Sequence, residues 1–324
     1  MGKMIRIGTR ESQLAVWQAT KVQQLLLENN FQSELVYIKS EGDIDLQTPL
    51  YEMGVQGIFT KSLDIALLNN SIDIAVHSMK DVPTQMAKGI VQAAVLERAS
   101  YKDILVYKEA SMINAPWSMI NENASAQENP FTVNQSPFIF ATSSIRRKAQ
   151  WLNRYPHHTI ENLRGNVNTR IKKVAESHWH GAIFAAAGIE RIGLRPSNSI
   201  DLDWMLPAPA QGAIMVVGRE GDDYFLNACK HFNHNHTAIC TKIERDFLRI
   251  LLGGCSTPIS ALAQVKENNL IFKGNILSVD GKEKVAIEKE APLSDSVDFG
   301  KIAAKEILQN GAQKIVDGIR NGSN

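Results

Sequence analysis

The strongest constraint in the sequence is one local pattern that occurs twice: an apolar strand, a small polar turn and a helix. IRIGTRES and IFATSSIRR carry it, and Thr142 stands in the second copy where Thr9 stands in the first. A second strand and then a third apolar run follow each copy, IDIAVHSM in the first and GAIFAAAG in the second. Strands that alternate with helices are typical of an α/β domain with a mainly parallel sheet. We therefore predict two similar α/β halves that bind a ligand at their seam.

The final part of the chain has a different pattern. TAICTKIERDFLRILL predicts an amphipathic helix that ends at Gly253 and Gly254. ISALAQVKE, LIFKGNILSV and KVAIEKEA predict three strands, because the turn signals ENN and VDGKE separate them. With a closing helix expected over about residues 297–310, this predicts a small α+β domain with a three-stranded antiparallel sheet. Residues 109–136 show no sustained periodicity and predict an irregular insert.

The composition excludes several classes of protein. The chain has 35 basic and 34 acidic side chains, and this balance argues against a nucleic-acid surface. No stretch approaches the roughly 20 apolar residues that a membrane span needs, and the N-terminus lacks the apolar core of a signal peptide. Three cysteines in 324 residues do not form a disulfide framework, so a reducing compartment is expected. We expect a soluble, cytoplasmic protein with neither a membrane nor a nucleic-acid partner.

Arginines gather at the turns of both predicted halves. A helix N-terminus attracts anions through its free N–H groups, and a guanidinium adds bidentate recognition of a carboxylate or phosphate. Any one of these arginines alone reads equally well as an exposed side chain without a target. Their repetition at matching turns favours a small ligand with several carboxylates or phosphates. The arginines are Arg10, Arg146, Arg147, Arg164, Arg170 and Arg191.

VHSMKDVP is the main candidate for catalysis. It places Lys80 and Asp81 at the C-terminal end of a buried strand, where open α/β sheets carry their chemistry. A carboxylate beside a lysine is often only a structural ion pair. Among many arginines, however, a carboxylate can stabilise a developing cation and transfer its proton. His77 is expected to be a packed strand histidine.

The three cysteines differ in context. Cys229 and Cys240 bracket a histidine-rich segment, CKHFNHNHTAIC, whose spacing fits no standard zinc site, so no metal is expected. Cys255 lies in LLGGCSTPIS, after a helix C-terminus whose dipole disfavours a thiolate. Repeated nucleophilic turnover is therefore poorly supported there, whereas a thiol that is alkylated once needs no lowered pKa. The residues alone leave the role of Cys255 open.

Six motifs, taken together and in order, closely resemble the porphobilinogen deaminase (hydroxymethylbilane synthase) family. They are IRIGTRESQLAVWQA, VHSMKDVP, ATSSIRR, LRGNVNTR, LPAPAQGAI and ERDFLRILLGGCSTPISALA. The resemblance implies a monomeric enzyme of haem and tetrapyrrole biosynthesis that joins four porphobilinogen molecules into linear hydroxymethylbilane and releases ammonia. It implies a dipyrromethane cofactor, held by a thioether to Cys255, that primes the growing oligopyrrole chain.

The resemblance also implies a fold and a division into domains. Two domains with the type II periplasmic-binding-protein fold are expected, followed by the small α+β domain. Their expected bounds are 1–103 with 212–232 for the first, 104–211 for the second and 233–324 for the third.

The resemblance assigns roles residue by residue. Asp81 matches the catalytic carboxylate. Besides Cys255, the residues that match cofactor contacts are Lys80, Thr142, Ser144, Arg146, Arg147, Asn166, Arg170 and Gln211. The residues that match substrate contacts are Arg10, Ser12, Gln18, Phe59, Arg164 and Arg191. Gln56 departs from the family, since a lysine of the loop over the active site is expected there.

Two other functions are compatible with parts of the sequence. A non-catalytic bilobal protein that binds a small polycarboxylate would explain the two halves and the arginines, but not Cys255 in a third domain. A metal-dependent hydrolase would use the histidine-rich segment, and it would lose activity with chelators.

Overall fold

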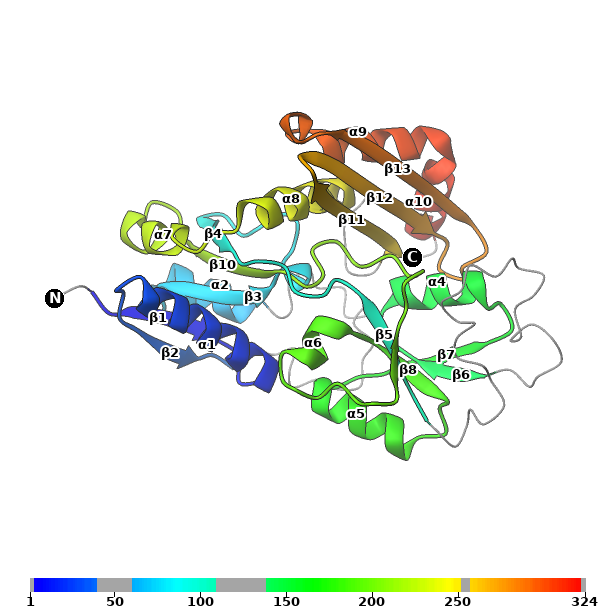
Figure 1. The fold of residues 1–324 in the computed structure, drawn as a ribbon, viewed down its shortest axis with the longest axis horizontal. Coiled ribbons are helices and arrows are strands. Elements are labelled where there is room, and N and C mark those ends of the chain that lie inside the picture. The colour runs from blue at the N-terminus through cyan, green and yellow to red at the C-terminus, as the bar shows by residue number, and fades with distance from the viewer. Residues whose placement is uncertain (1–2, 40–59, 109–137, 252–256, 322–324) are drawn as a thin grey trace.

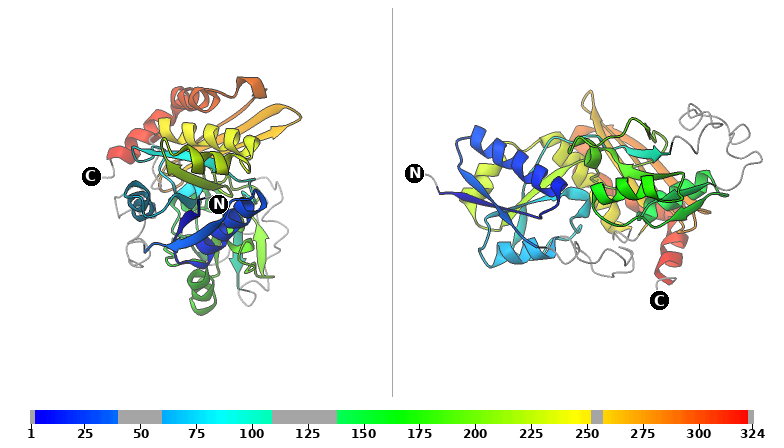
Figure 2. Two further views of the ribbon diagram at one scale, coloured as in Figure 1. Left: turned by 90° about the vertical axis from the view of Figure 1, so that its left-hand side faces the viewer. Right: turned by 90° about the horizontal axis from the view of Figure 1, so that it is seen from below.

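The two copies of the strand–turn–helix pattern form two α/β lobes, and the C-terminal part forms a separate three-stranded sheet (Figure 1). The structure is a computed structural model, and it describes residues 3–39, 60–108, 138–251 and 257–321. Figure 2 shows the two lobes at opposite ends of the long axis of the molecule. The predicted fold class, two similar α/β units and a small α+β unit, is confirmed. The predicted insert at 109–136 lies outside the described residues.

The first lobe is built on a five-stranded sheet. In spatial order its strands are β2 (Ser33–Tyr37), β1 (Ile5–Thr9), β3 (Ile74–Ser78), β10 (Ile214–Arg219) and β4 (Ile90–Val95). Strands β1, β2 and β3 are parallel, whereas β10 runs antiparallel to both of its neighbours. The helices of this lobe are α1 (Gln13–Glu28), α2 (Lys61–Leu68) and α7 (Asp223–Lys230). Ala19, Val22 and Leu26 recur at helical spacing on α1 and pack against the sheet as its core.

The second lobe repeats this topology. In spatial order its strands are β7 (Thr159–Glu161), β6 (Ile139–Ala141), β8 (Gly181–Ala185), β5 (Asp103–Tyr107) and β9 (Ser199–Asp201). Its helices are α4 (Ile145–Arg154), α5 (Val167–Glu176) and α6 (Ala186–Glu190). The fourth strand is antiparallel in both sheets. Because β5 follows β4 and β10 follows β9, two chain segments cross between the lobes.

The C-terminal sheet has the order β11-β12-β13 and is antiparallel throughout. Its strands are β11 (Ile259–Lys266), β12 (Asn269–Leu277) and β13 (Lys284–Pro292). Helices α8 (Asn235–Ile250), α9 (Phe299–Ile307) and α10 (Gln313–Asn321) accompany it. Ile243 and Phe247 of α8 share one apolar core with Phe272 of β12 and Ala303 of α9.

The closing helix differs from the prediction. We expected one helix over about residues 297–310, but α9 ends at Ile307 and α10 begins at Gln313. Gly311 lies between them with a φ of 105°, a left-handed conformation that glycine adopts without strain. The chain therefore kinks there and continues as a second helix instead of ending.

A buried carboxylate joins the C-terminal unit to both crossing segments. Glu244 of α8 accepts hydrogen bonds from Arg98 Nη1 at 2.6 Å and from the backbone N–H of Ala210 at 2.6 Å. It also accepts from the backbone N–H of Ala263 in β11 at 2.8 Å. Arg98 and Ala210 lie on the two segments that cross between the lobes, so one side chain ties three parts of the fold together.

Within the described ranges, none of the helices combines the length and the hydropathy that a bilayer crossing requires.

The buried histidine His158 should contribute to the pH dependence of stability. Burial, followed by His180 and His157, lowers the pKa of His158 to about 4, and its Nδ1 accepts a hydrogen bond from Trp151 Nε1 at 3.1 Å. An unfolded histidine titrates near 6.5, so the stabilisation is complete above that pH and is lost as the pH falls towards 4. Between pH 7.5 and 5, we expect wild-type protein to lose about 1–2 kcal/mol more unfolding free energy than His158→Gln.

Urea unfolding at the two pH values measures this difference. His157→Gln is the matched control, because the His157 side chain is exposed and is the smallest named cause of the lowered pKa of His158. It should retain most of the wild-type pH dependence. Equal losses in wild type and His158→Gln would show that His158 is not the responsible group.

Candidate active site

The turn that carries Lys80 and Asp81 follows the central strand β3 of the first sheet. It is a single turn of 3-10 helix, η2 (Met79–Asp81). The Met79 side chain is buried, and its backbone N–H donates to the carbonyl of Ala213 at 3.0 Å. Lys80 and Asp81 therefore lie at the C-terminal end of the parallel strand β3, as the sequence predicts.

Asp81 lines a small polar cavity together with two of the predicted substrate residues. These are Arg10, from the turn after β1, and Gln18, from α1. The Gln18 amide Nε2 donates to Ser78 Oγ at 2.9 Å, which ties α1 to the end of β3. The described residues that line it are Arg10, Ala15, Gln18, Thr60, Val76, His77, Ser78 and Asp81.

His77 also lines this cavity, although the sequence suggested only a packed strand histidine. Its side chain is buried, and among the described residues its Nε2 has no hydrogen-bond partner. Burial and then the charge of Arg10 lower the pKa of His77 to about 4, so the ring is neutral near pH 7.

A buried ion cluster forms the second-lobe side of the site. Arg146 Nη2 lies 2.8 Å from Asp103 Oδ2, and Arg147 Nη2 lies 2.8 Å from Asp103 Oδ1. Gln211 Nε2 donates to the same Oδ1 at 2.9 Å. All four side chains are at least nine-tenths buried. Burial alone raises the pKa of Asp103, but Arg146 and Arg147 more than reverse this and hold it below its ordinary value.

Lys80 brings the first lobe into this cluster. Burial lowers its pKa to about 8; Asp81 opposes this change, whereas Arg147 and Arg146 add to it. An ammonium in such a position is short of negative partners. A ligand that adds negative charge here would raise the pKa of Lys80 back towards its ordinary value.

Arg170 and Arg164 extend the same positive region. Burial lowers the pKa of Arg170 to about 10, repulsion from Arg147 and Arg164 adds to this, and Asp81 opposes it. Arg170 Nε donates to the carbonyl of Gly165 at 2.7 Å, which fixes the base of its guanidinium. The predicted residues of the two lobes thus lie close enough for their charges to interact, and Asp81 is one of them.

Arg191 is placed differently. Its Nη2 donates to the carbonyl of Gly212 at 2.6 Å, and its guanidinium carbon lies 5.7 Å from the centre of the Trp17 ring. Burial lowers its pKa to about 10. Arg191 therefore sits where α6, α1 and the returning chain meet. No described contact links it to Asp81.

Several predicted binding residues already have local hydrogen bonds. Three are helix N-caps: Ser12 accepts from Ala15 N at 3.4 Å, Ser144 from Arg147 N at 3.5 Å and Asn166 from Thr169 N at 2.9 Å. Thr142 Oγ1 accepts from the backbone N–H of Ser144 at 3.2 Å. These hydrogen bonds fix the turns at the site. That the same residues contact a ligand remains a prediction. Cys255, Phe59 and Gln56 lie outside the described residues.

The other two cysteines lie in separate cores. Cys229 packs in the first lobe and Cys240 in the C-terminal unit. Burial raises the pKa of Cys229 to about 12, and burial together with Glu244 raises that of Cys240 to about 11, so neither thiol ionises near pH 7. His234, from the segment between them, caps α8 by accepting from Thr237 N at 3.2 Å. In the part of the chain that the structure describes, no group of three His, Cys, Asp or Glu side chains could hold a metal ion.

The site includes a residue that sequence analysis missed. Asp103 opens a strand in YKDILVY, and no local signal indicates that its partners lie more than 40 residues further along the chain. The only clue in the sequence is a carboxylate at the start of an apolar strand. Such a carboxylate is expected to be buried, and a buried carboxylate requires a cation beside it. Arg98 and Glu244 were missed for the same reason.

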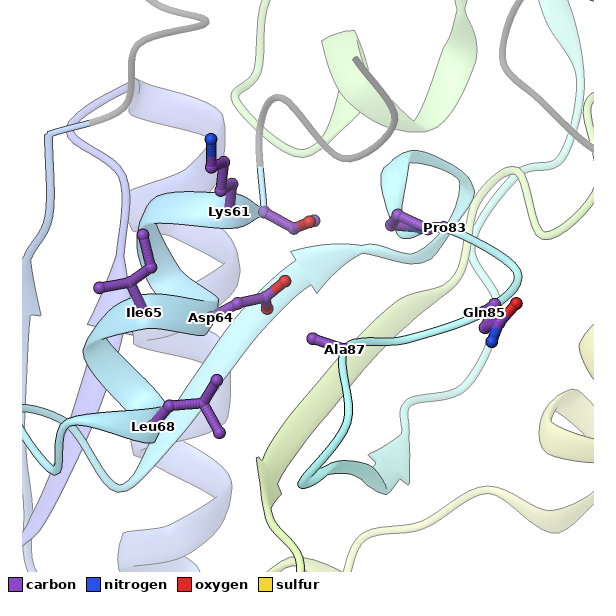
Figure 3. A pocket seen from close by; sticks show the side chains of 8 residues that line it. Lys61, Asp64, Ile65, Leu68, Pro83, Gln85 and Ala87 are labelled. Atoms are coloured by element: carbon purple, nitrogen blue, oxygen red, sulfur yellow. The ribbon is translucent and has the colours of Figure 1, made fainter.

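A second hollow lies beside the site, between α2 and the segment after η2 (Figure 3). Asp64 points from α2 toward Ala87, and burial raises the pKa of its carboxyl group. Of the predicted site residues that the structure describes, none lines this hollow. Within the described ranges, it is lined by Thr60, Lys61, Asp64, Ile65, Leu68, Pro83, Gln85 and Ala87.

Removal of the Asp103 charge should destabilise the whole chain. Asp103→Asn leaves two buried guanidinium groups without their shared anion, and loss of one partner in a buried ion pair typically costs about 3–5 kcal/mol. Asp203→Asn is the matched control, because Asp203 pairs with Lys102 on the surface, where such pairs contribute about 0–1 kcal/mol. Urea unfolding measures both. A loss for Asp103→Asn no greater than that of the control would rule out this role for Asp103.

Comparison with known proteins identifies the family. The model described as "Porphobilinogen deaminase, dipyromethane cofactor binding domain" matches residues 5–227. The model described as "Porphobilinogen deaminase, C-terminal domain" matches residues 238–309.

Curated relatives match over nearly the whole chain. The porphobilinogen deaminase of Desulforamulus reducens is 36% identical over 99% of this chain and 100% of its own length. The chloroplastic porphobilinogen deaminase of Oryza sativa is 36% identical over 98% of this chain and 87% of its own length. The probable porphobilinogen deaminase of Methanocaldococcus jannaschii is 41% identical over 83% of this chain and 86% of its own length.

Among solved structures, the ancestral cationic amino acid solute-binding protein AncCDT-1 is 13% identical, with a TM-score of 0.41 over 71% of this chain and 87% of its own. The methionine-binding protein MetQ is 14% identical, with a TM-score of 0.40 over 71% of this chain and 88% of its own. The two family models and the full-length curated relatives give one answer: the chain belongs to the porphobilinogen deaminase family.

Proposed function

We propose that Asp81 is the catalytic carboxylate of this chain and that the guanidinium groups around it hold the carboxylates of its ligands. The family assigns the reaction: the chain is an enzyme that joins four porphobilinogen molecules into hydroxymethylbilane, releases ammonia and uses a dipyrromethane cofactor. One observation carries the residue roles. Asp81 lines a polar cavity with Arg10 and shares an electrostatic neighbourhood with Arg147, Arg164 and Arg170.

The charges at the site fit a polycarboxylate. Each pyrrole unit carries an acetate and a propionate group, so the cofactor and substrate together bring many negative charges. Asp103 is one anion shared by Arg146 and Arg147, so part of the positive charge of the two guanidinium groups remains available to a ligand. The buried Arg146 Nε also has no hydrogen-bond partner among the described residues. We infer that Lys80, Arg146, Arg147 and Arg170 hold the cofactor, and that Thr142, Ser144, Asn166 and Gln211 shape the walls around it.

The dipyrromethane group, when bound, supplies the pyrrole carbon to which the first substrate is joined. The protein side of the chemistry follows from the charge of Asp81. When the carbon–nitrogen bond of porphobilinogen breaks, the electron pair leaves on ammonia and positive charge develops on the pyrrole. A carboxylate that accepts a hydrogen bond from the pyrrole N–H stabilises this charge. The same carboxylate can take up the ring proton that is released when the new carbon–carbon bond forms.

We infer that the cofactor is attached to Cys255, which lies outside the described residues. The other two thiols support this inference by elimination, because burial raises their pKa values to about 12 and about 11. A buried, protonated thiol cannot serve as an exposed anchor.

Substrate contacts by Arg10, Ser12, Gln18, Phe59, Arg164 and Arg191 are part of the same proposal. Arg10 and Gln18 have the best support, since both line the cavity with Asp81.

We also propose the domain bounds 1–103 with 212–232, 104–211 and 233–324. The pairing of β10 with β3 and β4, and of β5 with β8 and β9, supports the two crossings that these bounds require. A monomer in the cytoplasm, with no nucleic-acid or membrane partner, completes the proposal. No specific observation favours the non-catalytic binding protein as a second candidate.

Substitution of the proposed catalytic carboxylate tests the assignment. Asp81→Asn keeps the size of the side chain but removes its charge and its proton-accepting capacity. We expect turnover of porphobilinogen to fall by roughly 10²–10⁴-fold, the usual range for loss of a general acid–base group. Steady-state assays at pH 8, together with an intact mass to verify cofactor loading, measure this.

Asp64→Asn is the matched control, because Asp64 is a partly buried carboxylate in the adjacent hollow that shares Thr60. It should retain turnover within about threefold, as expected for a group outside the chemistry. Turnover in Asp81→Asn equal to that of the control would remove Asp81 from the mechanism.

A further inference from the structure

The C-terminal helix α8 reaches across to the turn that carries Asp81. Arg245 donates from Nη1 to the carbonyl of Val82 at 2.8 Å and to that of Met79 at 3.3 Å. Its Nη2 donates to the carbonyl of Pro83 at 2.6 Å. One guanidinium therefore grips the backbone on both sides of Lys80 and Asp81.

The hydrogen bonds from Arg245 satisfy carbonyl groups in and after this turn. A helical turn ends with carbonyl groups that have no partner inside the helix. In η2 the backbone N–H of Val82 satisfies the carbonyl of Met79, and Pro83 has no N–H with which to continue the ladder. The planar fork of Arg245 donates a second hydrogen bond to the Met79 carbonyl and also bonds to the carbonyls of Val82 and Pro83 that follow the turn. The single ammonium of a lysine cannot match this geometry.

The helix that carries Arg245 is rigidly part of the C-terminal unit. Ile243 and Phe247, which flank Arg245 on α8, are almost completely buried in the core of that unit. The preceding residue, Glu244, is fully buried and bonds to Arg98, Ala210 and Ala263. Residue 245 thus has little freedom to move relative to the three-stranded sheet.

The same helix leads directly to the proposed cofactor anchor. Helix α8 ends at Ile250, and Cys255 follows shortly after in sequence. Arg245 therefore bonds the C-terminal unit, to which the proposed anchor belongs in sequence, directly to the Asp81 turn.

We propose that Arg245 is a positioning residue that sets the placement of the Asp81 turn relative to the cofactor-bearing unit. The proposal rests on the function proposed above. Arg245 touches no substrate in this account; it acts through the backbone that presents Asp81. A displacement of about 1 Å at a reacting group can cost around 10²-fold in rate. Loss of the hydrogen bonds from Arg245 should therefore lower kcat more than it raises KM.

Two substitutions and one matched control test this. Arg245→Gln removes the fork, and Arg245→Lys keeps the charge without it. Arg249→Gln is the control, because Arg249 lies one turn further along α8 and pairs with Asp246 at 2.9 Å with its side chain 48% exposed. For each variant we would measure the intact mass, the thermal midpoint, and kcat and KM for porphobilinogen.

The expected result separates positioning from binding and from folding. Arg245→Gln should keep the cofactor mass and a KM within about threefold of wild type, while kcat falls by about 10–100-fold. Arg245→Lys should lie between Arg245→Gln and wild type. Arg249→Gln should match wild type in all four measurements.

Three outcomes would overturn the proposal. The first is a kcat for Arg245→Gln within twofold of that for Arg249→Gln. The second is a raised KM with unchanged kcat, which indicates a binding contact. The third is loss of activity in proportion to loss of folded or cofactor-loaded protein in both Arg245 variants, which indicates a purely structural bond. Absence of deaminase activity from wild type would instead contradict the proposed function, so the two failures are distinguishable.

Discussion

The site depends on one buried interaction, the carboxylate of Asp103 shared between the guanidinium groups of Arg146 and Arg147. Two arginines cannot be buried side by side without an anion. Their desolvation and mutual repulsion would cost more free energy than their packing contributes. One carboxylate compensates only part of their charge. The remainder, with Lys80 and Arg170 beside it, forms a fixed positive wall that a polycarboxylate can neutralise. The same contact therefore makes it possible to bury both arginines and leaves part of their positive charge uncompensated beside Lys80 and Arg170.

The second constraint is that the site is assembled from parts that are distant in sequence. Asp81 follows β3 of the first lobe, whereas the guanidinium wall comes from α4 and α5 of the second. The C-terminal helix α8 bonds through Glu244 to the segments that cross between the lobes and through Arg245 to the Asp81 turn. This arrangement suits a family whose reaction adds one unit after another to a primer. The turn proposed to react and the unit proposed to anchor the primer are bonded to each other through Arg245.

Local patterns were sufficient to predict most of the fold. The repeated strand–turn–helix segment predicts both lobes, and Ser12 caps α1 as a serine before a helical run should. The arginines at matching turns predict a positive site, and VHSMKDVP places Asp81 correctly at a strand end. The missed features are long-range. Asp103 and Arg245 find partners far along the chain, and no periodicity encodes a contact between a buried charge and a distant carbonyl. The break at Gly311 was missed because glycine near a helix end permits either a stop or a kink.

The most direct test of the account is the intact mass of the folded protein, measured for wild type and for Cys255→Ser, before and after addition of limiting porphobilinogen. Isolated wild type should exceed its polypeptide mass by one dipyrromethane, and it should gain further pyrrole units in discrete steps when substrate is added. Cys255→Ser should show the bare polypeptide mass under both conditions. Wild-type protein that carries no added mass, and gains none with porphobilinogen, would contradict the account.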